Sequence, residues 1–263
     1  MPRILLPLLA ALILVSGCDR MGSIEKIEPE ERLPLLLPRL PVGERPVSDG
    51  EAIEGPRVTV LENGLTVVVQ RDTRFPLASL RLYVRAGSAW ETPREAGISH
   101  FFEHMVFKGT RRLGPGEAAR TIEAAGGEFN AGTSTDYTVY YADMPKESWR
   151  LGLDVIQDMA LNAVIDPAEL ESERKVVISE MEMGEDDPGR RQFKALQALL
   201  WPGSSYAWPI IGTRETVSAI TRQEMTDYVR RHYQPRSMLL LAVGDVTEEA
   251  VLAEARRHFG TLR

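Results

Sequence analysis

The feature that most constrains the fold is the sequence His-Phe-Phe-Glu-His at residues 100–104. Residues of an α-helix are about 100° apart, so His100 and His104 project in nearly the same direction and Glu103 lies about 60° to one side. The two phenylalanines then point elsewhere and can bury the helix against a core. We therefore expect a helix with one polar arc and one buried face.

The polar arc has the residue types of a zinc hydrolase. Two imidazoles one turn apart can bind one zinc ion and leave positions for another protein ligand and a water molecule. A carboxylate beside that water can accept its proton as general base. The order His-x-x-Glu-His is typical of one group of metallopeptidases. His100 and His104 are candidate ligands and Glu103 is the candidate base, although the motif alone also fits surface histidines on an amphipathic helix.

The composition excludes other classes. A net charge of −7 argues against nucleic acid as a main partner. Cys18 is the only cysteine among 263 residues, which excludes an intrachain disulfide and a cysteine-rich zinc site. Any zinc must therefore be bound by histidine and carboxylate. No Ser-His-Asp set is evident, so a serine hydrolase is not expected.

Residues 1–18 are typical of an export signal, with Arg3, an apolar run and small residues before Cys18. Val-Ser-Gly-Cys resembles the lipobox of bacterial lipoproteins, in which the cysteine is acylated. This predicts a protein of the bacterial cell envelope, on the periplasmic side, anchored to a membrane through Cys18. The signal does not specify whether this is the inner or the outer membrane. The alternative is an ordinary signal peptide that is cleaved off, with an incidental cysteine.

Residues 19–55 are rich in proline and charge, which indicates an extended tether. We expect residues 56–263 to form the folded domain. Periodicity and turn residues predict its elements. The predicted strands and strand-like stretches are 58–60, 65–69, 77–86, 128–143 and 237–243, and the predicted helices are 93–107, 117–125, 145–161, 167–183, 189–200, 221–232 and 247–259. Strands come first and last, so the class is α+β with a largely antiparallel sheet packed with helices.

A catalytic zinc needs a third protein ligand. Glu173 and Glu180 are seven residues apart in the helix predicted for 167–183, so both lie on one face. One glutamate can bind the metal, while the other can form a hydrogen bond to a metal ligand and so orient it. The spacing by itself leaves open which glutamate does which.

Three segments resemble the pitrilysin/insulinase family of zinc peptidases. They are His-Phe-Phe-Glu-His-Met-Val-Phe-Lys-Gly-Thr from His100, Gly-Gly-Glu-Phe-Asn-Ala-Gly-Thr-Ser from Gly126, and Ser-Glu-Arg-Lys-Val-Val-Ile-Ser-Glu-Met from Ser172. The resemblance implies one zinc ion per chain, bound by His100, His104 and Glu180, with Glu173 as the supporting acid. It also implies that Asn130 and Ala131 lie on the edge strand to which a substrate peptide is added.

The resemblance further implies a zinc endopeptidase that cleaves extended peptides with Glu103 as base, and the signal in residues 1–18 indicates that this enzyme is exported. Family members close two homologous halves around the substrate like a clamshell, and this sequence corresponds to the zinc-binding half. A second chain with the complementary half, or a homodimer, is the expected partner. The alternative function is a non-catalytic scaffold or assembly partner, because the family includes such members.

Overall fold

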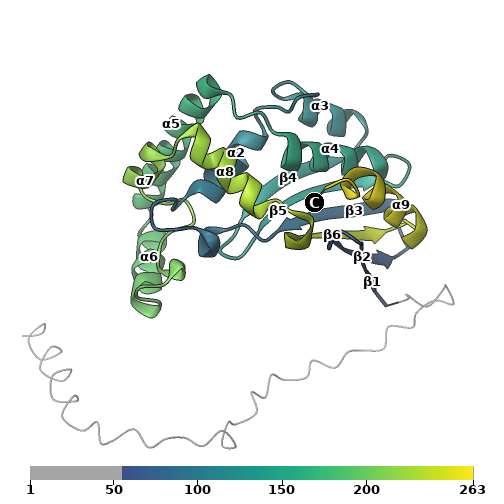
Figure 1. Cartoon of the computed structure of the whole chain (residues 1–263), viewed down its shortest axis with the longest axis horizontal. Coiled ribbons are helices and arrows are strands. Elements are labelled where there is room, and N and C mark those ends of the chain that lie inside the picture. The colour runs from purple at the N-terminus through teal and green to yellow at the C-terminus, as the bar shows by residue number, and fades with distance from the viewer. Residues whose placement is uncertain (1–54, 263) are drawn as a thin grey trace, which may run out of the picture. The chain divides into compact units, whose positions relative to one another are not determined.

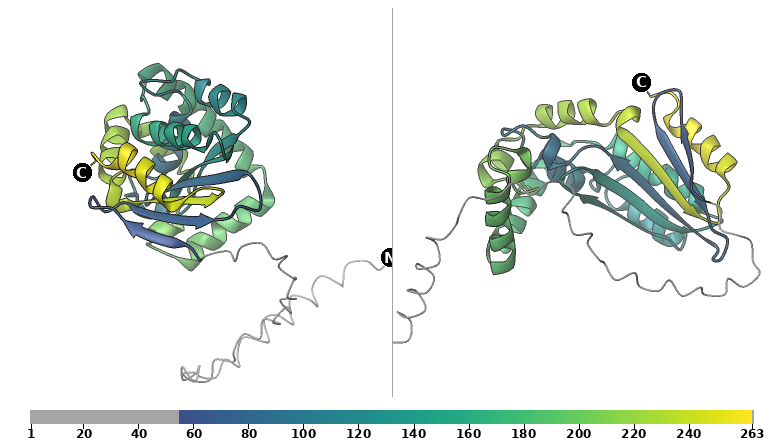
Figure 2. Two further views of the ribbon diagram at one scale, coloured as in Figure 1. Left: turned by 90° about the vertical axis from the view of Figure 1, so that its right-hand side faces the viewer. Right: turned by 90° about the horizontal axis from the view of Figure 1, so that it is seen from below.

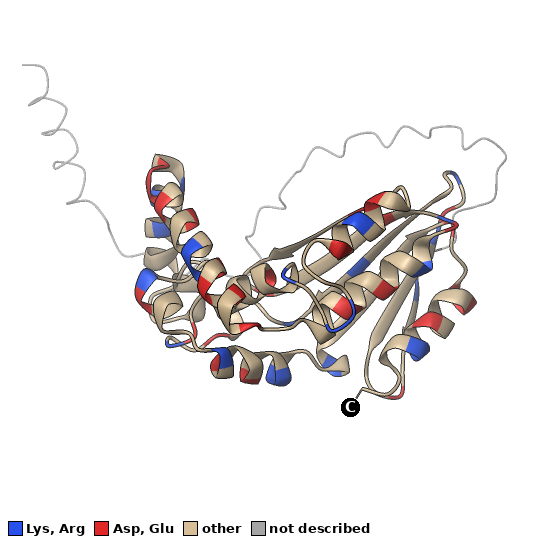
Figure 3. Cartoon of the chain, turned by 90° about the horizontal axis from the view of Figure 1, so that it is seen from above, with Lys and Arg blue, Asp and Glu red and all other residues tan. Residues whose placement is uncertain are grey.

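A computed structural model of the chain describes residues 55–262. The expected signal sequence, the lipidation site Cys18 and the tether before residue 55 lie outside the described residues. Within residues 55–262, no helix has the length and apolarity needed to cross a membrane. Lys and Arg are interspersed with Asp and Glu along the helices (Figure 3).

The centre of the described part is a six-stranded sheet in the order β1-β2-β6-β3-β5-β4. Its strands are β1 (Arg57–Val60), β2 (Thr66–Arg71), β3 (Leu77–Val84), β4 (Glu128–Thr133), β5 (Thr138–Pro145) and β6 (Met238–Gly244). Neighbouring strands are antiparallel except for β2 and β6, which are parallel. The predicted α+β class with a largely antiparallel sheet is confirmed.

Among residues 55–262 the helices fall in three groups along the chain, between β3 and β4, between β5 and β6, and after β6. They are α2 (Ile98–Val106), α3 (Glu117–Ala124), α4 (Trp149–Asn162), α5 (Pro167–Glu185), α6 (Pro188–Leu200), α7 (Arg214–Ala219), α8 (Arg222–His232) and α9 (Glu248–Phe259). Figure 1 shows α2, α5, α6, α7 and α8 gathered beyond one end of the sheet, with α3, α4 and α9 along its length.

One face of the sheet is covered by helices. Leu80, Leu82 and Val84 alternate along β3 and are fully buried on this face. They meet α4, which contacts β3 and β5, while α9 contacts β2 (Figure 2). The residues between them in β3 are only partly buried. Burial of one face fixes the strand register, because a slip by one residue would expose the whole apolar set.

The β1–β2 hairpin forms as Asn63-Gly64 predicts. Gly64 has φ +89°, a left-handed conformation that glycine adopts without strain. The Asn63 side chain accepts a hydrogen bond from the Leu65 N–H, and it donates one of 2.7 Å to the Phe259 carbonyl. The turn therefore also holds the C-terminal end of α9 against the sheet.

The structure corrects three element predictions. The motif helix begins at Ile98 and not at Pro93, because Gly97 has φ +94° and interrupts the helical path. The strand-like stretch 128–143 is a hairpin, with a turn at residues 134–137 between β4 and β5. Helix α7 was not predicted, although Thr213 and Thr216 form a capping box at its start.

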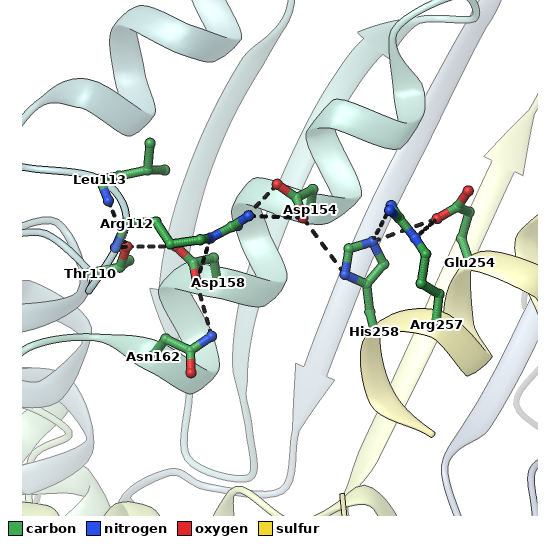
Figure 4. A network of polar contacts seen from close by, with 9 residues as sticks. All are labelled: Thr110, Arg112, Leu113, Asp154, Asp158, Asn162, Glu254, Arg257 and His258. Atoms are coloured by element: carbon green, nitrogen blue, oxygen red, sulfur yellow. Dashed lines mark hydrogen bonds and ion pairs between the residues drawn. The ribbon is translucent and has the colours of Figure 1, made fainter. Parts of the chain in front are cut away.

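The loop that leaves the motif helix is attached to α4. Thr110 donates a 2.5 Å hydrogen bond to Asp158, a buried carboxylate that also contacts Asn162 and Arg112 (Figure 4). A buried carboxylate is stable only when its oxygens have partners. The network therefore fixes the chain directly after α2, and with it the exit from the motif.

Candidate metal centre

Helix α2 has the two faces that the motif predicts. Phe101, Phe102 and Met105 are fully buried, whereas His100 and His104 are only half-buried. Burial of two phenylalanines holds this short helix against the core with several kcal/mol of apolar stabilisation, at about 1.5–3 kcal/mol for each side chain. Because this face is fixed against the core, His100, Glu103 and His104 are held on the opposite, less buried face of the helix.

A buried carboxylate anchors the start of α2. Glu91 accepts hydrogen bonds from the backbone N–H groups of Gly97 (2.8 Å) and Ser99 (2.9 Å) and from the Ser99 hydroxyl (2.6 Å). These donors include N–H groups that lack partners inside the helix. Burial raises the pKa of Glu91, and the hydrogen bonds oppose that rise. Ser99 also lies 2.7 Å from the Tyr228 hydroxyl, which joins α2 to α8.

Helix α5 brings the acidic residues to α2. Its start is capped by Asp166, whose side chain accepts from the N–H groups of Ala168 and Glu169, with Pro167 in the first turn. Arg174 donates to the backbone carbonyls of Val217 and Ile220, and its guanidinium lies 5.3 Å from the Phe101 ring centroid. The two helices are therefore packed together, as Figure 1 shows.

His100, His104 and Glu180 come together, each with one ligand atom within 4.8 Å of the others. Glu180 Oε2 lies 3.7 Å from His100 Nε2 and 3.5 Å from His104 Nε2. In residues 55–262 no other group of three such side chains is this close. Two imidazole nitrogens and one carboxylate oxygen are a donor set that fits zinc.

The imidazole of His100 is in the form that binds a metal. Burial, with a smaller effect from the adjacent His104, lowers the pKa of His100 to about 4. His100 is therefore neutral at pH 7, and its contact with Glu180 is not an ion pair. Among residues 55–262 its buried Nδ1 finds no hydrogen-bond partner.

Glu173 occupies a different position from Glu180. Its Oε2 lies 3.1 Å from His104 Nδ1, on the side of the ring away from the shared group, and its Oε1 lies 2.5 Å from Lys108 Nζ. The spacing of the two glutamates left their roles open. In the structure Glu180 faces both Nε2 atoms and Glu173 contacts the opposite nitrogen of His104.

Glu103 lies beside this group and outside it. Thr133 of β4 donates a 2.6 Å hydrogen bond to Glu103 Oε2. Burial raises the pKa of Glu103, and the Thr133 hydrogen bond and the neighbouring His104 oppose that rise. Sequence reasoning did not single out Thr133, although it lies in the segment quoted from Gly126. Lys108 was likewise missed, although it belongs to the segment quoted from His100.

Asn130 and Ala131 lie on β4, the strand at one edge of the sheet. The Ala131 N–H donates a 2.8 Å hydrogen bond to its neighbour Asn130 Oδ1. Beside the strand's end a cleft of about 1510 Å³ includes His100, Glu180 and Thr133 in its wall and extends to α6 and residues 209–215. The edge strand and the candidate metal centre therefore adjoin the same open space.

Comparison with known proteins agrees with this geometry. Residues 66–214 match the model of insulinase, peptidase family M16, and residues 219–263 match the model of the M16 inactive domain. An uncharacterised zinc protease of Mycobacterium tuberculosis is 34% identical over 82% of this chain and 50% of its own length. The mitochondrial-processing peptidase subunit beta of Bos taurus is 34% identical over 78% of this chain and 41% of its own length.

Among solved structures, the first half of the periplasmic protease PqqL from Escherichia coli superposes with a TM-score of 0.72. It is 26% identical, and the match covers 80% of this chain and 47% of that one. The chain spans about half the length of the curated relatives that it matches.

Proposed function

Because the chain belongs to the insulinase family of peptidases, M16, we propose that it is the zinc-binding half of an endopeptidase that hydrolyses extended peptides. One observation carries the proposal. His100, His104 and Glu180 converge within 4.8 Å while the Glu103 carboxylate lies beside them and outside the group. Hydrolysis by an activated water requires a metal site of that kind and an adjacent carboxylate that is not a metal ligand.

His100, His104 and Glu180 would hold one zinc ion, which would lower the pKa of a water molecule and polarise the scissile carbonyl. Glu103 accepts the proton of the attacking water and delivers it to the departing amine. Burial raises the pKa of Glu103 toward the range in which a carboxylate performs both transfers. The Thr133 hydrogen bond fixes one oxygen of Glu103. Because water is the attacking group, the reaction needs no covalent intermediate between enzyme and peptide.

The substrate is an extended peptide that pairs with the free edge of β4. Neighbouring residues of an antiparallel pair point their N–H groups alternately to the partner strand and away from it. Ser134 N–H donates to the Tyr137 carbonyl, so the bonded positions of β4 are Gly132 and Asn130. The N–H of Ala131 therefore points outward, toward a peptide added at the edge.

The proposed partner is a second half-domain, on another chain or in a second copy. The match to only half of each relative and the likeness to one half of PqqL support this. A complementary half would cover the open side of the cleft and exclude water. The alternative, a non-catalytic scaffold, has no need of the zinc motif, whereas His100, Glu103, His104 and Glu180 are all present.

Export and anchoring are also part of the proposal. Residues 1–18 support delivery to the periplasmic side of the cell envelope, with acyl chains on Cys18 holding the protein to a membrane. The mass of the mature protein checks this point, because an N-terminal residue other than an acylated Cys18 contradicts the anchor.

The test separates the metal ligand from the base. Glu103→Gln is expected to bind zinc as the wild type does and to lose at least about a hundredfold in kcat, because an amide cannot accept the proton. Glu180→Gln is expected to weaken zinc by about tenfold or more. Zinc content and cleavage of a quenched peptide are measured for both, with Glu123→Gln, on the exposed face of α3, as control. An active Glu103→Gln enzyme would refute the assigned roles, and a wild-type protein without zinc would favour the scaffold.

A further inference from the structure

Lys108 contacts Glu173, on the side of His104 that faces away from Glu180. It follows α2 by two residues, and its Nζ lies 2.5 Å from Glu173 Oε1 and 3.8 Å from Glu169 Oε2. The other oxygen of Glu173 lies 3.1 Å from His104 Nδ1. The carboxylate of Glu173 therefore bridges an ammonium group and a candidate zinc ligand.

The carboxylate that forms this bridge is buried, so its orientation depends on its partners. The Glu173 side chain is only 8% exposed, against 28% for Lys108. A carboxylate removed from water needs charged or hydrogen-bonding partners, and these partners also hold it in one orientation. Lys108 extends from the end of α2 and Glu173 belongs to α5, so the pair also links the two helices that carry the ligands.

We propose that Lys108 is a positioning residue of the zinc site and acts on His104 through Glu173. This inference rests on the proposed zinc function. The ammonium group holds Oε1, which leaves Oε2 to accept the Nδ1–H of His104. That hydrogen bond fixes the ring orientation and the tautomer in which Nε2 is free to bind the metal.

The experiment measures zinc affinity and not activity. The full chain is stripped of metal, and its zinc Kd is determined by competition with a fluorescent zinc indicator. Lys108→Met is expected to raise the Kd by about tenfold, at the low end of the range for residues that support metal ligands. Lys108→Arg should restore most of the affinity, because it keeps the charge. If Lys108→Met does not fold, as judged by circular dichroism, Lys108→Gln is measured in its place.

Lys146→Met is the matched control. Lys146 makes a similar ion pair with Asp245 at 2.8 Å, away from the site, and its loss should leave the zinc Kd unchanged. A general loss of stability would affect both variants, whereas a positioning role affects only Lys108.

A double-mutant cycle tests whether Lys108 acts through Glu173. Glu173→Gln alone should raise the Kd, and adding Lys108→Met to it should change little more, because the mediating carboxylate is already gone. Additive effects, or a wild-type Kd in Lys108→Met, would overturn the inference and leave the proposed function standing. A wild-type chain that binds no zinc would overturn both.

Discussion

At the scale of a residue, His258 shows how position sets protonation. Its side chain is 7% exposed and faces Asp154 of α4, Glu254 and Arg257 of its own helix, and Arg112 (Figure 4). Burial, followed by the charge of Arg257, lowers its pKa below the ordinary value. A solvated histidine near the C-terminal end of a helix would instead be favoured in its charged form by the helix dipole.

That lowered pKa predicts acid sensitivity. Between the folded pKa and the unfolded value of about 6.5, the unfolded chain binds more protons than the folded one. The free energy of unfolding contributed by His258 is therefore complete above pH 6.5 and falls as the pH falls through this window. Denaturant unfolding at pH 7.5 and pH 5.5 should show a smaller loss for His258→Gln than for the wild type. Equal losses would contradict the assignment.

At the scale of an element, the edge strand β4 gives a test of peptide addition. Ala131→Pro removes an N–H that points away from β5, so the ladder of the sheet is kept while one bond to an added peptide is lost. We expect the KM for an extended peptide to rise about three- to tenfold, the equivalent of one hydrogen bond. Zinc binding should be unchanged.

Ala131→Ser is the control for this experiment, because it alters the side chain and keeps the N–H. The Asn130 side chain occupies the Ala131 N–H in the absence of peptide, so it must move aside when a substrate binds. If Ala131→Pro cleaved peptides with a wild-type KM, the proposed pairing along β4 would be wrong.

At the scale of the whole molecule, the ligands and the base all come from residues 100–180, whereas the cleft beside them is open. The chain alone should therefore bind zinc but hydrolyse slowly, because water reaches the site and weakens the interactions that stabilise developing charge. Adding a homologous second half should raise kcat/KM by at least about tenfold. Peptide cleavage is measured against protein concentration, with analytical ultracentrifugation to identify the monomer. Full activity in a dilute monomer would contradict the prediction.

The sequence by itself determined the local features. The spacing of His100, Glu103 and His104 on one arc follows from the helical repeat, and the burial of Phe101 and Phe102 follows from the same repeat. Asn63-Gly64 predicted the first hairpin, because the turn needs a residue that adopts the left-handed backbone of Gly64 without strain. The resemblance of three segments to one family predicted Glu180 as the third ligand, whereas spacing alone could not distinguish it from Glu173.

Only the tertiary structure decided the contacts between distant segments. Thr133 reaches Glu103 because β4 lies next to α2, and Lys108 reaches Glu173 because α5 packs on that helix. The start of α2 depends on Gly97, whose left-handed backbone does not follow from a periodic apolar pattern. The lowered pKa of His258 likewise depends on burial between α4 and α9. Periodicity reports which face of an element is buried, whereas the partner on that face depends on how the whole chain folds.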